Sequence, residues 1–115
     1  MRSAITSLEQ ISRQLEPPAG KRDTVRKKVI DYSEHFINHI ETLKAFDVST
    51  ADGSGLFGSP ISDEGIDIEM ALKLLKQEVD HSGLNPASGG HLGYIPGGGI
   101  YYAALGDYLA DVFNR

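Results

Sequence analysis

Side chains that could carry a proton in a reaction gather near the end of the chain, around a glycine-rich stretch. They are His81, His91, Tyr94, Tyr101 and Tyr102. Histidine and tyrosine serve as general acids and bases when a substrate lies within hydrogen-bond reach. No nucleophile, matched carboxylate or lysine lies close enough to complete a catalytic set. Aromatic residues that lie at an interface with one polar tip are therefore the simpler interpretation.

The glycine-rich stretch itself, Pro96-Gly97-Gly98-Gly99, precedes a predicted helix. Free backbone N–H groups and the helix dipole favour an anion at such a place. The Lys-Ser/Thr pair of a nucleotide-binding P-loop is missing, and so is the strand that precedes a dinucleotide fingerprint. Two interpretations stay open: a structural turn, or a loop that closes on a ligand or a partner.

A second pair of chemically capable residues, His35 and His39, has the spacing at which two imidazoles on one helix face can share a zinc ion. The metalloprotease pattern also needs a glutamate directly after the first histidine, and Phe36 occupies that position. No third ligand is evident. Surface histidines beside an apolar stripe are the main interpretation, and a metal site is the alternative.

Composition limits the classes of function. The 115 residues suffice for one domain, and the net charge of -5 argues against a nucleic-acid partner or an anionic membrane surface. The absence of cysteine fits a reducing compartment. No apolar run is long enough for a signal peptide or a membrane span. We therefore expect a soluble, cytoplasmic protein.

Apolar residues at spacings of three and four predict helices over 3–16, 24–46, 67–81 and from residue 101 onward. Pro17-Pro18 should end the first helix, Asp23 or Thr24 should cap the second, and Gly83 should stop the third in a left-handed conformation. No alternating pattern predicts a strand with confidence. The predicted fold class is all-α, with three or four helices. The predicted apolar faces comprise Ile5, Leu8, Ile11 and Leu15; Val25, Val29, Tyr32, Phe36, Ile40 and Leu43, widened by Ile30 and Ile37; and Ile68, Ala71, Leu72, Leu75 and Val79.

Two long segments, 47–65 and 82–100, lack a regular pattern and are rich in polar residues or glycine. Ordering one residue costs on the order of 1–2 kcal/mol of backbone entropy, and loops of this length are uncommon in compact domains. Two interpretations stay open: the segments are disordered, or they lie on a surface that another chain or domain provides. In either case we expect a chain that is not self-contained. Because neither Gly nor Pro follows Phe113, the last helix lacks these stop signals, and we expect the chain to be a fragment.

The run Gly89-Gly90-His91-Leu92-Gly93-Tyr94-Ile95-Pro96-Gly97-Gly98-Gly99, followed by Ala104-Leu105-Gly106-Asp107-Tyr108-Leu109, resembles the early region of a known enzyme family. That family is the pyridoxal-phosphate-dependent group II decarboxylases, which include the aromatic-L-amino-acid, histidine and glutamate decarboxylases. The helices predicted over 25–46 and 67–80 resemble the first two long helices of these enzymes. The resemblance covers nearly the whole chain but only about a quarter of a family enzyme.

The resemblance implies an arm-like N-terminal segment of a type I pyridoxal-phosphate enzyme whose large domain is absent here. It divides the chain into a helical arm, 1–81, and an active-site-entrance loop with the start of the next helix, 82–115. The arm would wrap over the partner subunit of a homodimer. Tyr94, Ile95, Pro96 and Gly97 would contact an amino-acid substrate.

The lysine that holds the cofactor, the aspartate on its ring nitrogen and the histidine stacked on the ring all lie outside this chain in the family. Pyridoxal 5'-phosphate is therefore expected in the parent enzyme and not on this fragment, which should be inactive alone. Where the aromatic amino-acid enzymes carry an aromatic residue and a threonine, this chain has Ile95 and Gly97, which argues against an aromatic substrate.

Three hypotheses follow. The first is the N-terminal arm of a pyridoxal-phosphate-dependent amino-acid decarboxylase, which pairs subunits and lines the active site. The second is a non-enzymatic, self-associating helical interaction module. The third is a metal-binding helical protein built on His35 and His39.

Overall fold

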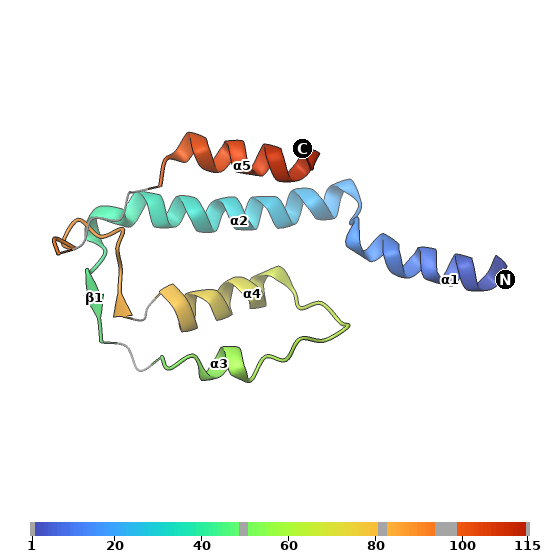
Figure 1. The fold of residues 1–115 in the computed structure, drawn as a ribbon, viewed down its shortest axis with the longest axis horizontal. Coiled ribbons are helices and arrows are strands. Elements are labelled where there is room, and N and C mark those ends of the chain that lie inside the picture. The colour runs from blue at the N-terminus through green and yellow to red at the C-terminus, as the bar shows by residue number, and fades with distance from the viewer. Residues whose placement is uncertain (1, 49–50, 81–82, 94–98, 115) are drawn as a thin grey trace.

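The computed structural model describes residues 2–48, 51–80, 83–93 and 99–114. These residues are mostly helical, and the sheet has only two short strands, which confirms the predicted all-α class (Figure 1). The elements in order are α1 (Arg2–Ser12), the 3-10 helix η1 (Arg13–Leu15), α2 (Ala19–His39), the 3-10 helix η2 (Ile40–Thr42), β1 (Phe46–Asp47), α3 (Ser54–Phe57), α4 (Ile68–Leu75), the π-helix η3 (Lys76–Asp80), β2 (Gly83–Leu84) and α5 (Tyr101–Phe113).

The start of α2 differs from the prediction. Pro17 and Pro18 do end the first helical segment, but α2 begins directly after Pro18, which has the extended backbone of an N-cap residue (φ -61°, ψ 158°). Proline suits the start of a helix because it has no N–H to satisfy and its φ is already helical. The predicted caps Asp23 and Thr24 are therefore wrong. Thr24 lies inside the helix, where its hydroxyl donates to the carbonyl of Gly20 at 3.0 Å.

The end of α2 also differs. Helical structure stops at Thr42, short of the predicted residue 46, because Leu43 has an extended backbone (φ -68°, ψ 133°) that leads to β1 at Phe46. β1 and β2 are antiparallel, with Phe46 opposite Leu84 and Asp47 opposite Gly83. The sequence analysis missed both strands. Two residues are too few for an alternating pattern, and the pairing joins segments far apart in the chain.

The third predicted helix is confirmed in position. The Asp67 carboxylate caps α4 by accepting from the N–H of Glu69 at 2.8 Å, and η3 continues the helical path to Asp80. Gly83 has the predicted left-handed backbone, with φ 78°. Within the segment predicted to be irregular, the short helix α3 begins after Gly53, which is also left-handed (φ 77°). Hydrogen bonds from Ser54 lower the pKa of the Asp52 carboxyl, first from its side chain and then from its N–H, which lies 2.9 Å from Oδ1 of Asp52.

The last helix, α5, spans Tyr101–Phe113 as predicted from its apolar spacing. Asn114 follows it in a left-handed conformation (φ 51°, ψ 47°), and its N–H donates to the carbonyl of Ala110. Asparagine tolerates this region better than most residues. The sequence analysis considered only glycine and proline and so missed this helix-ending residue.

The chain is extended and lacks a closed core. Its extents are 62 × 34 × 23 Å, and its radius of gyration of 18.4 Å exceeds the ~13 Å of a compact domain of this length. None of the described apolar residues is buried. Figure 1 shows α1 projecting from one end. Of the helices in the described ranges, none is long and apolar enough to cross a membrane.

The best-connected part of the molecule, which we call the inner unit, comprises α2, α4 with η3, and the β1–β2 ribbon with its continuation to His91. α2 and α4 are in contact, with half-buried apolar residues on both helices. The Lys28 ammonium pairs with Glu69, and this hydrogen bond raises the pKa of Lys28. The apolar residues predicted for α4 are partly enclosed: Ile68, Ala71 and Leu72 are half-buried, whereas Leu75 and Val79 stay exposed.

Candidate functional site

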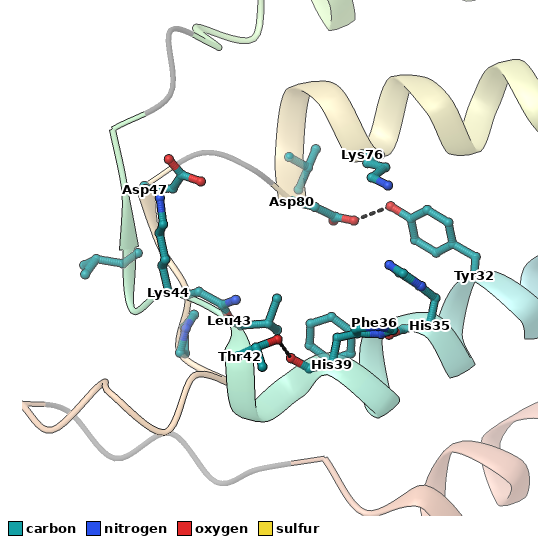
Figure 2. Close-up of a pocket in the computed structure, with 15 residues that line it drawn as sticks. Tyr32, His35, Phe36, His39, Thr42, Leu43, Lys44, Asp47, Lys76 and Asp80 are labelled. Atoms are coloured by element: carbon teal, nitrogen blue, oxygen red, sulfur yellow. Dashed lines mark hydrogen bonds between the residues drawn. The ribbon is translucent and has the colours of Figure 1, made fainter.

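A cavity of about 660 Å³ lies within the inner unit, between the C-terminal half of α2, the end of η3 and the ribbon (Figure 2). This volume falls in the range of small-molecule sites. Its walls combine apolar and titratable side chains. They are Tyr32, His35, Phe36, His39, Thr42, Leu43, Lys44, Asp47, Lys76, Val79, Asp80, Gly83, Leu84, Asn85 and Pro86.

Tyr32 and Asp80 meet at one side of this cavity. Figure 2 shows the Tyr32 hydroxyl reaching from α2 to the carboxylate of Asp80 at the end of η3, to which it donates a hydrogen bond. Burial raises the pKa of Tyr32, and the bond to the negatively charged Asp80 raises it further. The hydroxyl therefore stays protonated at neutral pH. It serves as a hydrogen-bond donor that ties two helices together, and it is unsuited to act as a base.

His35 and His39 line the cavity from the same helix as Tyr32, and His35 lies beside Tyr32 (Figure 2). Their ring centroids are 4.2 Å apart with the planes tilted by 36°, and Nδ1 of His39 lies 2.7 Å from the carbonyl oxygen of His35. Zinc sites use three or four protein ligands. Within the described ranges, no group of three histidine, cysteine, aspartate or glutamate residues gathers in a way that would hold a metal ion.

The electrostatics of the cavity bear on which ligands it could take. Its walls include the C-terminal ends of the α2–η2 and α4–η3 helical segments, whose dipoles favour cations and disfavour anions. Lys44 follows the first of these ends, and the wall holds a second acid, Asp47, besides Asp80. A phosphate group is usually held at a helix N-terminus, whereas these two helical segments bring their C-terminal ends to the cavity. The described residues of the cavity therefore offer no helix N-terminus for the phosphate of pyridoxal phosphate.

The residues predicted to contact substrate, Tyr94, Ile95, Pro96 and Gly97, lie outside the described residues, as does His81. His91 is half-buried, and its N–H donates to the carbonyl of Ser88 at 3.0 Å. The rings of Tyr101 and Tyr102 meet edge to face at 6.0 Å and are exposed. No hydrogen bond joins His91 to either tyrosine in the part of the chain that the structure describes.

The sequence analysis missed Ser88, the one described polar residue that is buried. Its hydroxyl donates to the carbonyl of Leu43 at 2.6 Å and accepts from the N–H of Gly90 at 3.2 Å. A Cβ on Gly90 would lie 3.4 Å from the Cβ of Ala45. These contacts hold the start of the glycine-rich segment against Leu43 and Ala45, which directly follow the α2–η2 helical segment. The Asn85-Pro86 pair could have predicted a turn here, but no local signal identifies Leu43 as its partner.

The largest feature available for binding is the set of uncovered apolar helix faces. On α1 the predicted stripe is present, but all of its members are exposed. On α5 every described residue is exposed. The exposed apolar residues are Ile5, Leu8, Ile11 and Leu15 on α1 and η1, and Tyr101, Tyr102, Leu105, Tyr108, Leu109, Val112 and Phe113 on α5. Exposed apolar areas of this extent mark interaction sites.

Comparison of the chain with models of known protein families, with curated proteins and with solved structures finds no match.

Proposed function

We propose that this chain is the helical N-terminal arm of a pyridoxal-phosphate-dependent amino-acid decarboxylase. In this role it pairs two copies of the enzyme and forms part of the wall of the active-site entrance. Two independent features support the proposal. The first is the resemblance of residues 89–99 and 104–109 to the early region of these enzymes. The second is the exposure of apolar surface on the helices that would contact the partner.

The exposed surface carries the pairing part of the proposal. The chain exposes 10188 Å², whereas a compact monomer of 12.5 kDa exposes about 6,200 Å². The excess is about 4,000 Å² per chain, or about 8,000 Å² for two copies, which is more than the roughly 2,000–5,000 Å² that a large, obligate interface buries on both partners together. A chain with so much uncovered surface needs a partner to be stable, and a second copy with the adjoining large domain would provide it.

The entrance loop carries the substrate part. Tyr94, Ile95, Pro96 and Gly97 would border the substrate, with the Tyr94 ring and hydroxyl nearest to the chemistry. The hydrogen bonds around Ser88 hold the start of this loop against the inner unit. The cofactor would supply the electron sink for decarboxylation, and it would be bound by residues outside this chain.

The test is to express the complete reading frame that carries this chain. We expect a yellow product that takes up pyridoxal phosphate, sediments as a dimer and releases carbon dioxide from at least one amino acid in a panel of aliphatic, acidic and basic substrates. A colourless product that binds no cofactor would refute the enzymatic part.

A second candidate is a non-enzymatic helical module that self-associates. The observation that favours it is the uncovered apolar surface of α1 and α5, which self-association alone would explain. The two candidates differ in one property of the reading-frame product. Both predict self-association, but only the decarboxylase predicts cofactor uptake.

A further inference from the structure

The helix α2 has a second apolar face that no described part of the chain covers. Lys28 and Tyr32 define the face toward α4, because their side chains bond to Glu69 and Asp80. Successive residues of an α-helix are about 100° apart. Ile30 and Ile37 therefore lie about 140–160° around the helix from Tyr32, on the far side.

We name the surface from this far side back to Val29, which lies about 60° from Tyr32, the outer face of α2, and we define it as Arg26, Val29, Ile30, Ser33 and Ile37. Its three aliphatic residues are all 40–50% exposed: Val29 41%, Ile30 48% and Ile37 43%. Ser33 is a small residue in its middle, so a second helix could approach closely. A helix that is apolar on two sides is suited to lie between two partners, and α4 is only one of them.

The helix α5 has complementary properties. Leu105, Tyr108, Leu109 and Val112 recur at spacings of three and four and form a continuous apolar stripe. The charged residues of α5 within Tyr101–Phe113 are both acidic, Asp107 and Asp111. By contrast, the first half of α2 is basic, with Lys21, Arg22, Arg26, Lys27 and Lys28 against the single acid Asp23. Each helix therefore offers an apolar stripe, with opposite charges beside it.

Within a single chain, neither the outer face of α2 nor the apolar stripe of α5 is buried. Figure 1 shows α5 running in the opposite direction to α2, on the side away from α4. Every residue of α5 is nevertheless exposed, and so is the outer face of α2. In a two-fold symmetric pair, α5 of each copy would cover the outer face of α2 in the other copy, so both apolar surfaces would be buried twice.

We propose that the outer face of α2 is the docking site for α5 of a second copy of this chain. Two equivalent α2–α5 contacts form in the pair, antiparallel, with Asp111 near the Arg26 end. This inference rests on the pairing of two copies in the proposed function and does not depend on its cofactor chemistry. It adds which helices meet and which face each uses.

These 115 residues contain no cysteine, so the contact is testable by disulfide formation once any cysteine elsewhere in the complete product has been replaced by serine. One tagged population of the complete reading-frame product carries Ser33→Cys, and a second carries Leu105→Cys, Tyr108→Cys or Leu109→Cys in turn. The populations are mixed, allowed to exchange and oxidised. Only contacts between copies join the two tags. The matched control replaces Ser33→Cys by Asn38→Cys, which lies about 140° around α2 from Ser33.

We expect the mixed-tag product with Ser33→Cys to exceed that with Asn38→Cys by at least about tenfold, because a disulfide needs Cα atoms within about 7 Å. Arg26→Glu should lower its yield about two- to fivefold, and Asp111→Arg in the other population should restore it. Equal yields for Ser33→Cys and Asn38→Cys would overturn the proposal. So would a bond that forms only when both cysteines are in one chain, since α5 would then cover its own α2. A cofactor-binding dimer with either result would retain the proposed function and reject this contact.

Discussion

The inner unit and the outer helices α1 and α5 share the same kind of sequence but differ in what they touch. α4 has its N-cap bond, contacts α2 and is linked to it by the Lys28–Glu69 and Tyr32–Asp80 pairs. α1 has a stronger stripe than α2, and α5 is longer than α4, but the hydrogen bonds described for both are local. Apolar periodicity thus predicts that a helix forms, but it does not indicate whether the surface that covers the apolar face comes from the same chain or from another.

This contrast implies two kinds of response to mutation. Changes in the inner unit should alter the stability of the single chain. Changes on the outer helices should leave the single chain unaffected and alter only its association. The four experiments below follow this division, and those on stability are done at dilutions where the chain is monomeric.

The largest effect is expected on α1. Leu8→Asp with Ile11→Asp places two charges on its apolar stripe. The dissociation constant of the paired chains should rise on the order of 100-fold or more, since each buried aliphatic side chain contributes about 1.5–3 kcal/mol. Sedimentation equilibrium measures this change, and circular dichroism should show unchanged helix content. Gln10→Asp, a charge on the polar side of α1, is the matched control. Equal association of the double variant and the control would contradict a role of α1 in pairing.

The next effect is expected at Ser88. Ser88→Ala removes a hydroxyl that bonds to both Leu43 and Gly90 at a buried site. Leaving these groups without a partner should lower the free energy of unfolding by about 2 kcal/mol. Urea denaturation provides the value. Ser59→Ala, at an exposed serine, should change it by less than about 0.5 kcal/mol. An unchanged free energy of unfolding for Ser88→Ala would mean that the Ser88 hydrogen bonds to Leu43 and Gly90 contribute nothing to the stability of the inner unit.

The same substitution, leucine to alanine, can be made in both regions, and its effect on the free energy of unfolding can be compared. Leu72→Ala, in the half-buried part of α4, should lower the free energy of unfolding by about 1.5 kcal/mol, below the range for fully buried leucines because the site is partly open. Leu109→Ala, the same change on exposed α5, should have almost no effect on the monomer. Similar losses from both variants would show that α5 packs within its own chain.

The smallest effect concerns Tyr32, and it depends on pH. Tyr32→Phe should cost about 1 kcal/mol through loss of the bond to Asp80. Because the pKa of Tyr32 is raised in the folded chain above its unfolded value of about 10, its stabilising contribution is complete below about pH 10 and is lost as the pH rises through the folded pKa. Urea titrations across this range should give a shallower alkaline decline for Tyr32→Phe than for the unaltered chain. Tyr102→Phe, at a mostly exposed ring, should reproduce the unaltered profile.

The parts of the fold that were predictable depend on neighbours in sequence. The helical stretches of α4 and α5 follow from their own spacing, and the cap at Asp67 follows from one residue and the N–H two positions later. The strand pair was not predictable in the same way, because Phe46 pairs with Leu84, which lies 38 positions later in the chain. The Tyr32–Asp80 and Ser88–Leu43 bonds share this property. They depend on distance in space, which periodicity does not encode.

The candidate site shows the same division. The histidine pair was visible from its spacing, and the structure places both rings on the cavity wall. The cavity itself was not predicted, because half of its lining comes from η3 and the ribbon. The role of Tyr94 to Gly97 remains a prediction, since these residues lie outside the described part of the chain.

The π-helix η3 has a consequence for how the length of this region can vary. A π-helical turn carries one residue more than the α-helical turn that it replaces, with hydrogen bonds from i to i+5. Deleting one residue between Lys76 and Val79 would therefore give an ordinary α-helical turn and leave the residues on either side of it facing as they do now. A helix of the present length without the wide turn would instead place Asp80 about 100° further around the axis, away from Tyr32. The π turn thus takes up one residue while Asp80 still faces Tyr32, so we expect homologous chains to tolerate the loss of one residue here.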